Sequence, residues 1–262
     1  MTIRFYANDK NEKALSAAFE LEKEAFSLGL KIVSFGEPAD VTIVLGGDGT
    51  ILRARRMYPK EALLGFNLGG LGYLAGVGQS DFAKALEMLS SGKFKVAERT
   101  LVEVKKTSTS EKAIALNEIS IMREMTGHAA IIELAVDGIR AARYMADGVI
   151  IATPTGSTAY SLASGGPVVM PDSKSFAITP VNPHALAVRP LVISDGVEIK
   201  ISSVRKINGT AEMLGVYSDG ESVFKLCEDE TLEIAKSQEV AKFIELEGFN
   251  PYEVLGRKLG WS

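Results

Sequence analysis

The chain has 262 residues, and 29 lysines and arginines against 33 aspartates and glutamates give a net charge of −4 at pH 7. This length supports one or two domains with a sizeable core. The acidic balance argues against a nucleic-acid-binding protein that works by neutralising phosphates. A single cysteine, Cys227, excludes an internal disulfide framework and a cysteine-rich zinc site. No apolar run approaches the roughly 18 residues of a membrane span, so we expect a cytoplasmic protein without a membrane partner.

The first 98 residues alternate strand and helix patterns, which is typical of βαβ units around a parallel sheet. Helical spacing of apolar residues predicts one helix between the caps at 8–11 and Gly29, and another between Ser80-Asp81 and Gly92. The predicted strands are Ile3 to Ala7, Leu30 to Phe35, Val41 to Leu45 and Leu63 to Phe66, and a short helix is expected from Thr50 to Met57.

From Arg99 onward strand patterns dominate, which favours a largely antiparallel, β-rich second domain. The predicted strands are Leu101 to Lys105, Ala113 to Met122, Ile131 to Val136, Val149 to Thr153, Val197 to Ile201, Val216 to Tyr217, Val223 to Leu226 and Thr231 to Ala235. Asp137-Gly138 between two apolar runs predicts a two-residue hairpin. Short helical pieces are expected at Ser157 to Ala163 and, after Asn250-Pro251, at Tyr252 to Leu259.

Glycines cluster early in the chain, where nine of the 25 lie between Gly46 and Gly78. The run Gly46-Gly47-Asp48-Gly49-Thr50 follows an apolar strand and opens a helix, so its backbone N–H groups can converge on an anion. Asp48 repels phosphate, unless it accepts a proton from an attacking hydroxyl or helps to hold Mg²⁺. The alternative is that Asp48 merely caps the helix. The paired glycines and the preceding strand favour the functional interpretation.

A second glycine-rich run, Gly70-Leu71-Gly72-Tyr73-Leu74-Ala75, has the spacing of the dinucleotide-binding fingerprint. Gly76 and Gly78 follow at once, so no helix opens where a pyrophosphate would need one. We therefore favour a glycine-rich wall of a ligand site, with Tyr73 as a stacking surface. There is no P-loop motif either.

Asn117-Glu118 interrupts an otherwise apolar strand pattern. Neighbouring residues of a strand point to opposite faces, so both could serve one ligand only at a bulge or a strand end. Asparagine both donates and accepts, and glutamate accepts from hydroxyls such as those of a ribose diol. The alternative is an exposed strand end without a ligand.

The segment from Tyr144 to Pro167 holds the densest set of polar residues. It predicts a strand, a hydroxyl-rich turn and a helix of small residues that ends at Gly165-Gly166-Pro167. Five hydroxyls between Thr153 and Tyr160 exceed what helix capping needs, and Tyr160 could stack on a base. A Ser-His-Asp hydrolase is not supported, because the chain lacks a Gly-x-Ser-x-Gly elbow.

Together these motifs resemble the NAD kinase family. Gly-Gly-Asp-Gly-Thr alone is shared with phosphofructokinases and with diacylglycerol and sphingoid kinases. Its combination with Asn117-Glu118, with Asp147-Gly148 and with the segment that ends at Pro167 is more specific. The resemblance is clear from Val41 to Gly220. It implies an α/β first domain (1–98, with about 237–262 returning to it) and a β-rich NAD-binding domain (99–236).

The resemblance implies transfer of a phosphoryl group to the 2′-hydroxyl of the adenosine ribose of NAD, which gives NADP. The donor would be ATP, another triphosphate or polyphosphate, with Mg²⁺ or another divalent metal. Asp48 would accept the proton of the hydroxyl, and Gly46, Gly47, Gly49 and Thr50 would serve phosphates.

The resemblance also implies a homodimer or homotetramer in which Asp147 and Asn182 reach NAD at a subunit boundary. Asn117 and Glu118 would hold the ribose on the nicotinamide side. The implied NAD-binding residues are Asp48, Gly49, Arg53, Tyr73, Asn117, Glu118, His128, Asp147, Thr158, Ala159, Tyr160, Ser161, Ala163 and Asn182, of which those from Thr158 to Ala163 would surround the adenine half.

Two other functions remain open from the sequence. A lipid kinase could use the same glycine run, but it would need an apolar or basic membrane-facing patch, and the net charge of −4 argues against that. A non-catalytic NAD sensor would bind the dinucleotide without transfer, and the presence of Asp48 argues against it.

Overall fold

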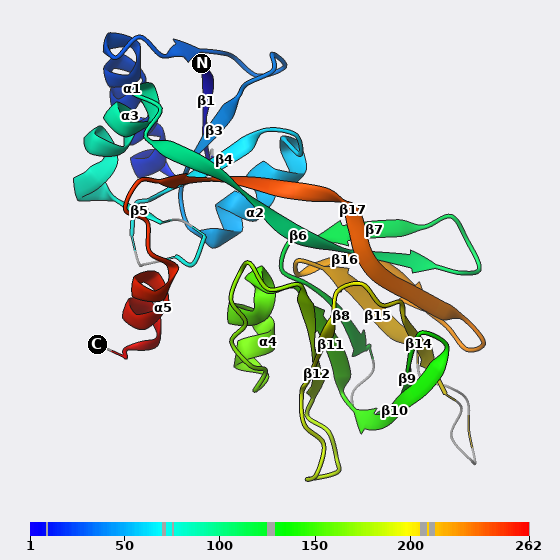
Figure 1. Ribbon diagram of the computed structural model, residues 1–262. Helices are drawn as coiled ribbons and strands as arrows, with labels where there is room; N and C mark the ends of the chain where they lie inside the picture. Colours follow the sequence, from blue (N-terminus) through cyan, green and yellow to red (C-terminus); the bar gives the residue numbers. More distant parts are fainter. Residues whose placement is uncertain are drawn as a thin grey trace. The chain divides into compact units, whose positions relative to one another are not determined.

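The computed structural model describes residues 1–8, 10–69, 72–74, 76–124, 129–204, 209 and 213–261 (Figure 1). The chain divides into two compact units, which are described in turn. The first unit comprises Met1–Glu98 with Ala241–Ser262, and the second comprises Arg99–Val240. None of the helices in the described ranges is long and apolar enough to cross a membrane.

The first unit contains a parallel sheet. Its central order runs from β2 (Lys31–Ile32) through β1 (Thr2–Ala7) and β3 (Val41–Leu45) to β4 (Ala62–Asn67). β5 (Val77–Gly78) and the last part of β17 (Thr231–Leu246) also pair with β4, both in parallel. Every residue of β3 and β4 is buried, as expected for parallel strands that are covered on both faces.

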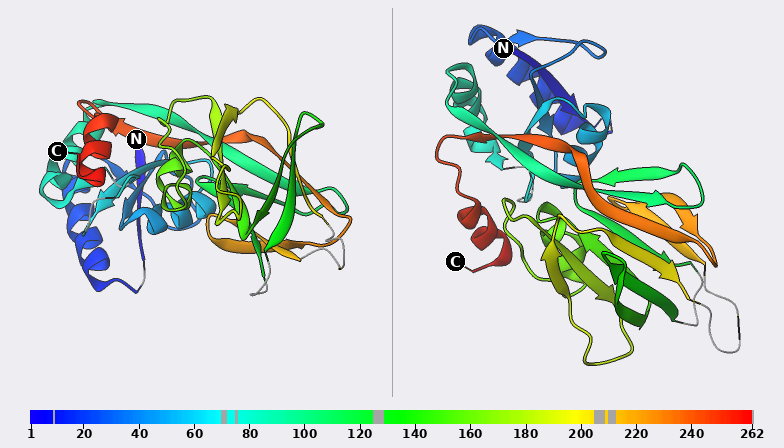
Figure 2. Two further views of the ribbon diagram at one scale, coloured as in Figure 1. Left: turned by 90° about the horizontal axis from the view of Figure 1, so that it is seen from below. Right: turned by 45° about the vertical axis from the view of Figure 1, so that its right-hand side comes forward.

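Helices cover this sheet on its two faces (Figures 1 and 2). α1 (Glu12–Ser27) and α3 (Phe82–Ser90, after the short 3₁₀ helix Gln79–Asp81) pack on one face, where Ile43, Leu45 and Phe66 join their apolar cluster. α2 (Asp48–Met57) contacts β3 and β4 outside that cluster, and α5 (Pro251–Leu259) ends the chain. The order β2-β1-β3 reverses the direction of winding beside β1, and ligands of such sheets bind at the carboxyl ends of the strands at this point.

The second unit is built from antiparallel strands. One sheet has the order β13-β12-β11-β8-β15-β16, and the other includes β10-β9-β14-β17 with β6 and β7. The strands are β6 (Phe94–Lys106), β7 (Lys112–Ala115), β8 (Glu118–Arg123), β9 (Ala130–Val136), β10 (Ile139–Ala146), β11 (Gly148–Ala152), β12 (Ser175–Val181), β13 (Leu191–Ser194), β14 (Ile199–Ser203), β15 (Leu214–Ser218) and β16 (Glu221–Leu226).

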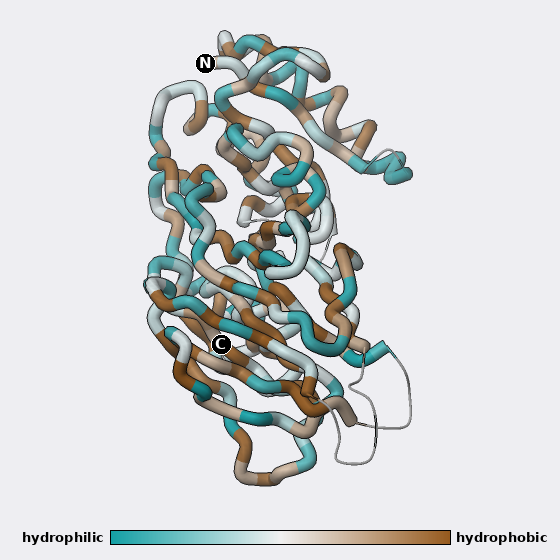
Figure 3. Tube along the Cα trace, turned by 90° about the vertical axis from the view of Figure 1, so that its right-hand side faces the viewer, coloured by the Kyte–Doolittle hydropathy of each residue, from teal (hydrophilic) through white to brown (hydrophobic). Residues whose placement is uncertain are grey.

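Apolar side chains from both sheets share one buried cluster, which includes Ile119, Ile132, Phe176 and Ile201. Hydrophobic and hydrophilic residues alternate along these strands in Figure 3, so one face of each sheet points into the core. A short 3₁₀ turn (Thr155–Thr158) and α4 (Tyr160–Ala163) follow β11, and α4 contacts β11 and β12.

The predicted fold class is confirmed, and several elements differ from the prediction. The single strand expected over 113–122 is two strands, because the chain leaves the sheet at Leu116 and Asn117. The strand expected over 231–235 continues to Leu246, past the polar residues that end its apolar pattern. Only Lys31–Ile32 of the strand predicted over 30–35 pairs with β1. β5, β12 and β13 were not predicted, and β10 was expected only as the second strand of the Asp137-Gly138 hairpin, without bounds.

Candidate functional site

The glycine run lies where β3 ends and α2 begins, at the carboxyl edge of the parallel sheet. Gly46 has φ +156°, and a Cβ there would lie 2.4 Å from the Thr50 hydroxyl oxygen, so the turn requires glycine at this position. Gly47 is the N-cap of α2 and has no side chain to cap it. The start of α2 therefore has no capping side chain at the positive end of its dipole, which favours an anion.

Asp48 is the first residue of α2, and its carboxylate does not cap the helix, so the capping alternative is wrong. The backbone N–H of Tyr73 donates to Oδ2 at 2.9 Å, and that of Leu74 donates to Oδ1 at 3.0 Å. The side chain keeps 34% of its exposure. A carboxylate oriented from two sides and still open to solvent can accept a further proton or hydroxyl.

A lysine from the C-terminal helix completes this group of residues. Nζ of Lys258 lies 3.9 Å from Oδ2 of Asp48 and 4.3 Å from the centroid of the Tyr73 ring. Burial lowers the pKa of Lys258, and the negative charge of Asp48 opposes that shift. Burial first, and Asp48 second, raise the pKa of the Tyr73 phenol. Lys258 is not recognisable as a site residue from the sequence, because its position fits an ordinary cation at a helix end.

The remaining predicted residues of the first unit lie along α2. Thr50 is in the first turn, where its N–H donates to the Gly47 carbonyl at 2.9 Å. Arg53 is exposed one turn further on. Soon after the run 70–75 the chain enters β5 at Val77, which agrees with the rejection of a dinucleotide fingerprint.

In the second unit, Asn117 and Glu118 stand at the break between β7 and β8. They are 8% and 6% exposed, so the exposed-strand-end alternative is wrong. The Asn117 carbonyl accepts from the N–H of Thr153 at 2.8 Å. A Cβ on Gly156 would lie 2.0 Å from the same carbonyl oxygen, so only glycine allows this approach.

Glu118 is a buried carboxyl group with an unsatisfied oxygen. Among the residues that the structure describes, its Oε2 has no hydrogen-bond partner. Burial first, and the nearby charge of Asp219 second, raise the pKa of Glu118 to about 7. A buried oxygen without a partner is unfavourable unless a ligand or water supplies a donor.

Most hydroxyls of the turn after β11 serve the local structure. Thr153 donates to the Leu116 carbonyl, Ser157 donates to the Pro154 carbonyl, and Thr158 donates to the Thr155 carbonyl. Ser161 is buried and shares a hydrogen bond of 2.9 Å with Thr179. Tyr160, in contrast, is 40% exposed, Ala163 is exposed and Ala159 is half-buried.

Asp147 and Asn182 lie at the opposite end of β11. The Asn182 amide donates to Oδ2 of Asp147 at 3.1 Å, and Nε of Arg123 lies 2.8 Å from Oδ1. Asn182 has φ +47°, so its backbone is in the left-handed region, and its side chain contacts Asp147 from this conformation. Arg123 was not among the predicted residues, since nothing near it in the sequence indicates this partner.

The described residues therefore form separate groups. Asp48 and Tyr73 meet in the first unit, and Asn117, Glu118 and the turn after β11 meet in the second. Asp147 and Asn182 form a pair at the other end of β11. His128 lies outside the described residues.

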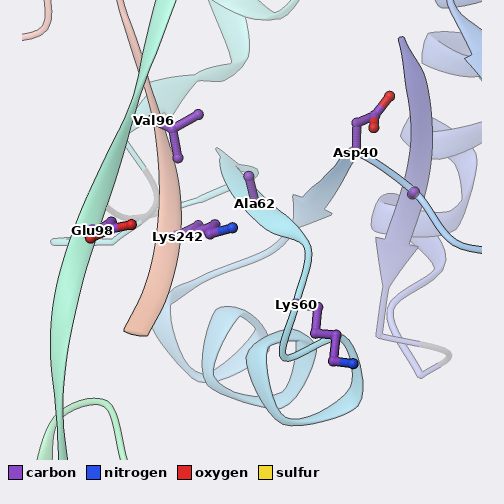
Figure 4. A pocket seen from close by; sticks show the side chains of 7 residues that line it. Asp40, Lys60, Ala62, Val96, Glu98 and Lys242 are labelled. Carbon is purple, nitrogen blue, oxygen red and sulfur yellow. The ribbon is translucent and has the colours of Figure 1, made fainter. Parts of the chain in front are cut away.

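An open pocket of about 790 Å³ lies elsewhere in the first unit (Figure 4). Asp40 precedes β3 and Ala62 begins β4, so this pocket is at the amino ends of the parallel strands. Lys60 and Lys242 line it together with Asp40 and Glu98, a balance of charges that does not select an anion. It is separate from the glycine run, which follows the carboxyl end of β3.

Among the residues described, no group of three or more His, Cys, Asp or Glu side chains is placed to hold a metal ion.

A parallel α/β unit with a glycine run at its carboxyl edge, followed by an antiparallel β-rich unit, defines a class of two-domain protein. The ATP-NAD kinase N-terminal domain family matches residues 6–94, and the ATP-NAD kinase C-terminal domain family matches residues 116–246. The chain belongs to the ATP-NAD kinase family.

Individual relatives agree with this membership. The chain is 39% identical to the NAD kinase of Carboxydothermus hydrogenoformans over 85% of this chain and 80% of that protein. It is 33% identical to the NAD kinase of Chlorobium limicola over 98% of this chain and 89% of that protein. An Archaeoglobus fulgidus NAD kinase solved with ATP superposes with a TM-score of 0.81 at 26% identity over 99% of both chains. The yeast NADH kinase solved with NADH has the same fold, with a TM-score of 0.86 at 24% identity over 100% of this chain and 88% of that chain.

Proposed function

We propose that this chain is an enzyme that phosphorylates NAD to NADP with ATP as the donor. The observation that carries the proposal is the Asp48 carboxylate, held by two backbone N–H groups beside the uncapped start of α2. This arrangement combines a proton acceptor with an anion site. The relatives described above, which are NAD kinases, support the same activity.

The acceptor is the 2′-hydroxyl of the adenosine ribose. Its oxygen forms a bond to the γ-phosphorus of ATP, while the bond from that phosphorus to the β,γ-bridging oxygen breaks and ADP leaves. The hydroxyl proton passes to the carboxylate of Asp48, which later releases it to solvent. Phosphoryl transfer asks the protein mainly for positioning and for stabilisation of charge, so one oriented base and a set of N–H donors are a sufficient contribution from this unit.

The first unit's Gly46, Gly47, Gly49 and Thr50 serve the phosphates in this proposal. Asn117 and Glu118 hold the nicotinamide-side ribose, because the orphan Oε2 of Glu118 needs the donor that a ribose hydroxyl supplies. Thr158 to Ala163 surround the adenine, with Tyr160 stacked on it. The proposed domains are 1–98 with about 237–262 for phosphate transfer, and 99–236 for NAD.

Two parts of the proposal concern partners. The divalent ion, Mg²⁺ or another, arrives with the triphosphate as part of the donor, because Mg²⁺ in such sites is bound largely by substrate phosphates and water. Polyphosphate is an alternative donor. A homodimer or homotetramer completes the site, with Asp147 and Asn182 reaching NAD from a neighbouring subunit.

The test is incubation of the purified protein with NAD, Mg²⁺ and either ATP or polyphosphate, with NADP read by an NADP-specific dehydrogenase. We expect NADP formation that Asp48→Asn lowers by about 10²–10⁴-fold, whereas Asp81→Asn, at an exposed aspartate at the start of α3, should remain active. NAD should also raise the melting temperature, because a ligand of the native state stabilises it. Stabilisation by diacylglycerol vesicles instead of NAD would support a lipid kinase, and binding of NAD without NADP formation would support a sensor.

A further inference from the structure

Lys258 contacts two residues that are far earlier in the chain, Asp48 by 210 positions and Tyr73 by 185. Its Nζ lies 3.9 Å from Oδ2 of Asp48 and 4.3 Å from the Tyr73 ring centroid, and the side chain is 13% exposed. The Tyr73 N–H donates to the same carboxylate, so Lys258 contacts both members of the hydrogen-bonded pair that Asp48 and Tyr73 form. α5 thereby reaches the residue on which the proposed function depends.

A cation in the last turn of a helix has an ordinary structural explanation, because it interacts favourably with the helix dipole. Arg257, the neighbour of Lys258, fits that explanation, since it is exposed and its Nε donates to the Glu253 carbonyl. Lys258 differs, because its ammonium group is withdrawn from water against a carboxylate and an aromatic face. Burying an ammonium group is unfavourable unless such partners compensate, so the helix end alone does not account for its position.

The separation of Lys258 and Asp48 also has a chemical consequence. Lys236 and Asp195 form a direct ion pair at 2.8 Å, whereas 3.9 Å is too long for a hydrogen bond between Lys258 and Asp48. The lysine therefore acts on Asp48 through its charge, without a hydrogen bond of its own to the carboxylate. The N–H groups of Tyr73 and Leu74 fix the direction of the carboxylate, and the ammonium group of Lys258 lies near it on a further side.

We infer that Lys258 is a positioning residue for phosphoryl transfer, which holds Asp48 and the Tyr73 segment in their reactive arrangement. This inference rests on the proposed function. It gives α5 a role in the phosphate-transfer unit, and that role requires no contact of Lys258 with NAD or with the donor.

The test compares Lys258→Met with Arg257→Met, which removes the same charge from the next position of the same helix. Lys258→Met should lower kcat by about tenfold to a hundredfold, the order expected when a reacting group is misplaced by about 1 Å. The KM for NAD and the melting temperature should change no more than in Arg257→Met. Lys258→Arg should restore most of kcat. Lys258→Gln is a second removal variant of similar length, in case the methionine variant does not fold.

A double-mutant cycle separates action through Asp48 from an independent contact with the donor. In an Asp48→Asn background, Lys258→Met should reduce the residual kcat by less than about twofold, because the residue it positions is already lost. A full additional loss would overturn the inference, as would wild-type kcat in Lys258→Met or a loss of kcat that follows the melting temperature and is not rescued by arginine. A wild-type protein that forms no NADP would overturn the proposed function itself, and the inference with it.

Discussion

The carboxylate of Asp219 accepts a hydrogen bond of 2.7 Å from the backbone N–H of Asn117, although the two residues are 102 positions apart in the sequence. The same carboxylate accepts from the N–H groups of Leu116 at 2.9 Å and Glu118 at 3.3 Å. These bonds satisfy the donors that the chain exposes where it leaves the sheet between β7 and β8. A residue of the turn after β15 therefore stabilises the break between β7 and β8. This break lets the neighbouring residues Asn117 and Glu118 serve one ligand.

Asp219→Asn should weaken NAD binding about tenfold or more. The new side chain is neutral, so three hydrogen bonds lose their charge, and its NH₂ group cannot accept from a backbone N–H as a carboxylate oxygen does. Asp137→Asn is a matched control. Both aspartates precede glycine in a hairpin turn with φ +48°, and both accept a backbone N–H, in Asp137 that of Glu198. The dissociation constant of NAD, measured by calorimetry, should change in Asp219→Asn and stay near wild type in Asp137→Asn. Equal changes in the two variants would contradict the role given to Asp219.

Glu118 should make the stability of the protein depend on pH. Its pKa is raised from 4.5 to about 7 in the folded protein, so the native state binds this proton more tightly than the unfolded state. The stability that results is fully present below pH 4.5 and is lost as the pH rises through 7, by about 3 kcal/mol in total. Urea unfolding of Glu118→Gln should show a gain over wild type that grows between pH 5 and pH 8. Glu111→Gln, at an exposed glutamate, should show no such trend.

Asp48→Asn should lower kcat by about 10²–10⁴-fold, because the amide cannot accept the proton of the attacking hydroxyl. The side chain keeps its shape, so NAD should bind with nearly unchanged affinity. Single-turnover kinetics and a separate binding measurement distinguish these effects. Wild-type turnover in this variant would remove Asp48 from the mechanism.

Gly156→Ala should damage both folding and NAD binding. Its Cβ would fall 2.0 Å from the Asn117 carbonyl oxygen, which is backbone and cannot move aside without shifting the break between β7 and β8. Overpacking of this kind costs about 1–3 kcal/mol or more. Gly256→Ala, in the interior of α5 with no atom within 4 Å of the new Cβ, should instead stabilise by about 0.5–1 kcal/mol. Thermal unfolding of the two variants, with and without NAD, tests both signs.

The sequence predicts those features whose causes are local. The alternation of strand and helix predicts the parallel sheet, and Asp137-Gly138 predicts a hairpin whose two residues have φ +48° and +78°. Asp219-Gly220 is the same dipeptide, but its hydrogen-bond partners lie about a hundred residues away in the sequence. The hydrogen bond from Asn117 to Asp219 could therefore not be predicted. Lys258 is hidden for the same reason. β10 has an uneven apolar pattern and exposed side chains, because it pairs on one side with β9 and ends its sheet.

Asp147 and Tyr160 should act from different subunits. Asp147 directly precedes β11 and Tyr160 follows it, and the five residues of an extended strand span about 16 Å. One chain therefore cannot easily aim both side chains at one nucleotide. A symmetric dimer would make two composite sites, each with Asp147 from one protomer and Tyr160 from the other.

Activity should then be lost on dilution to monomers. Asp147→Ala and Tyr160→Ala should each be inactive, and refolding the two variants together should restore part of the activity, because a mixed dimer holds one site with both residues intact. The measurement is NADP formation by the mixture against each parent, with Asp172→Ala mixed in place of Asp147→Ala to control for refolding yield. A fully active monomer, or no recovery after confirmed subunit exchange, would place Asp147 and Tyr160 in the same chain's site.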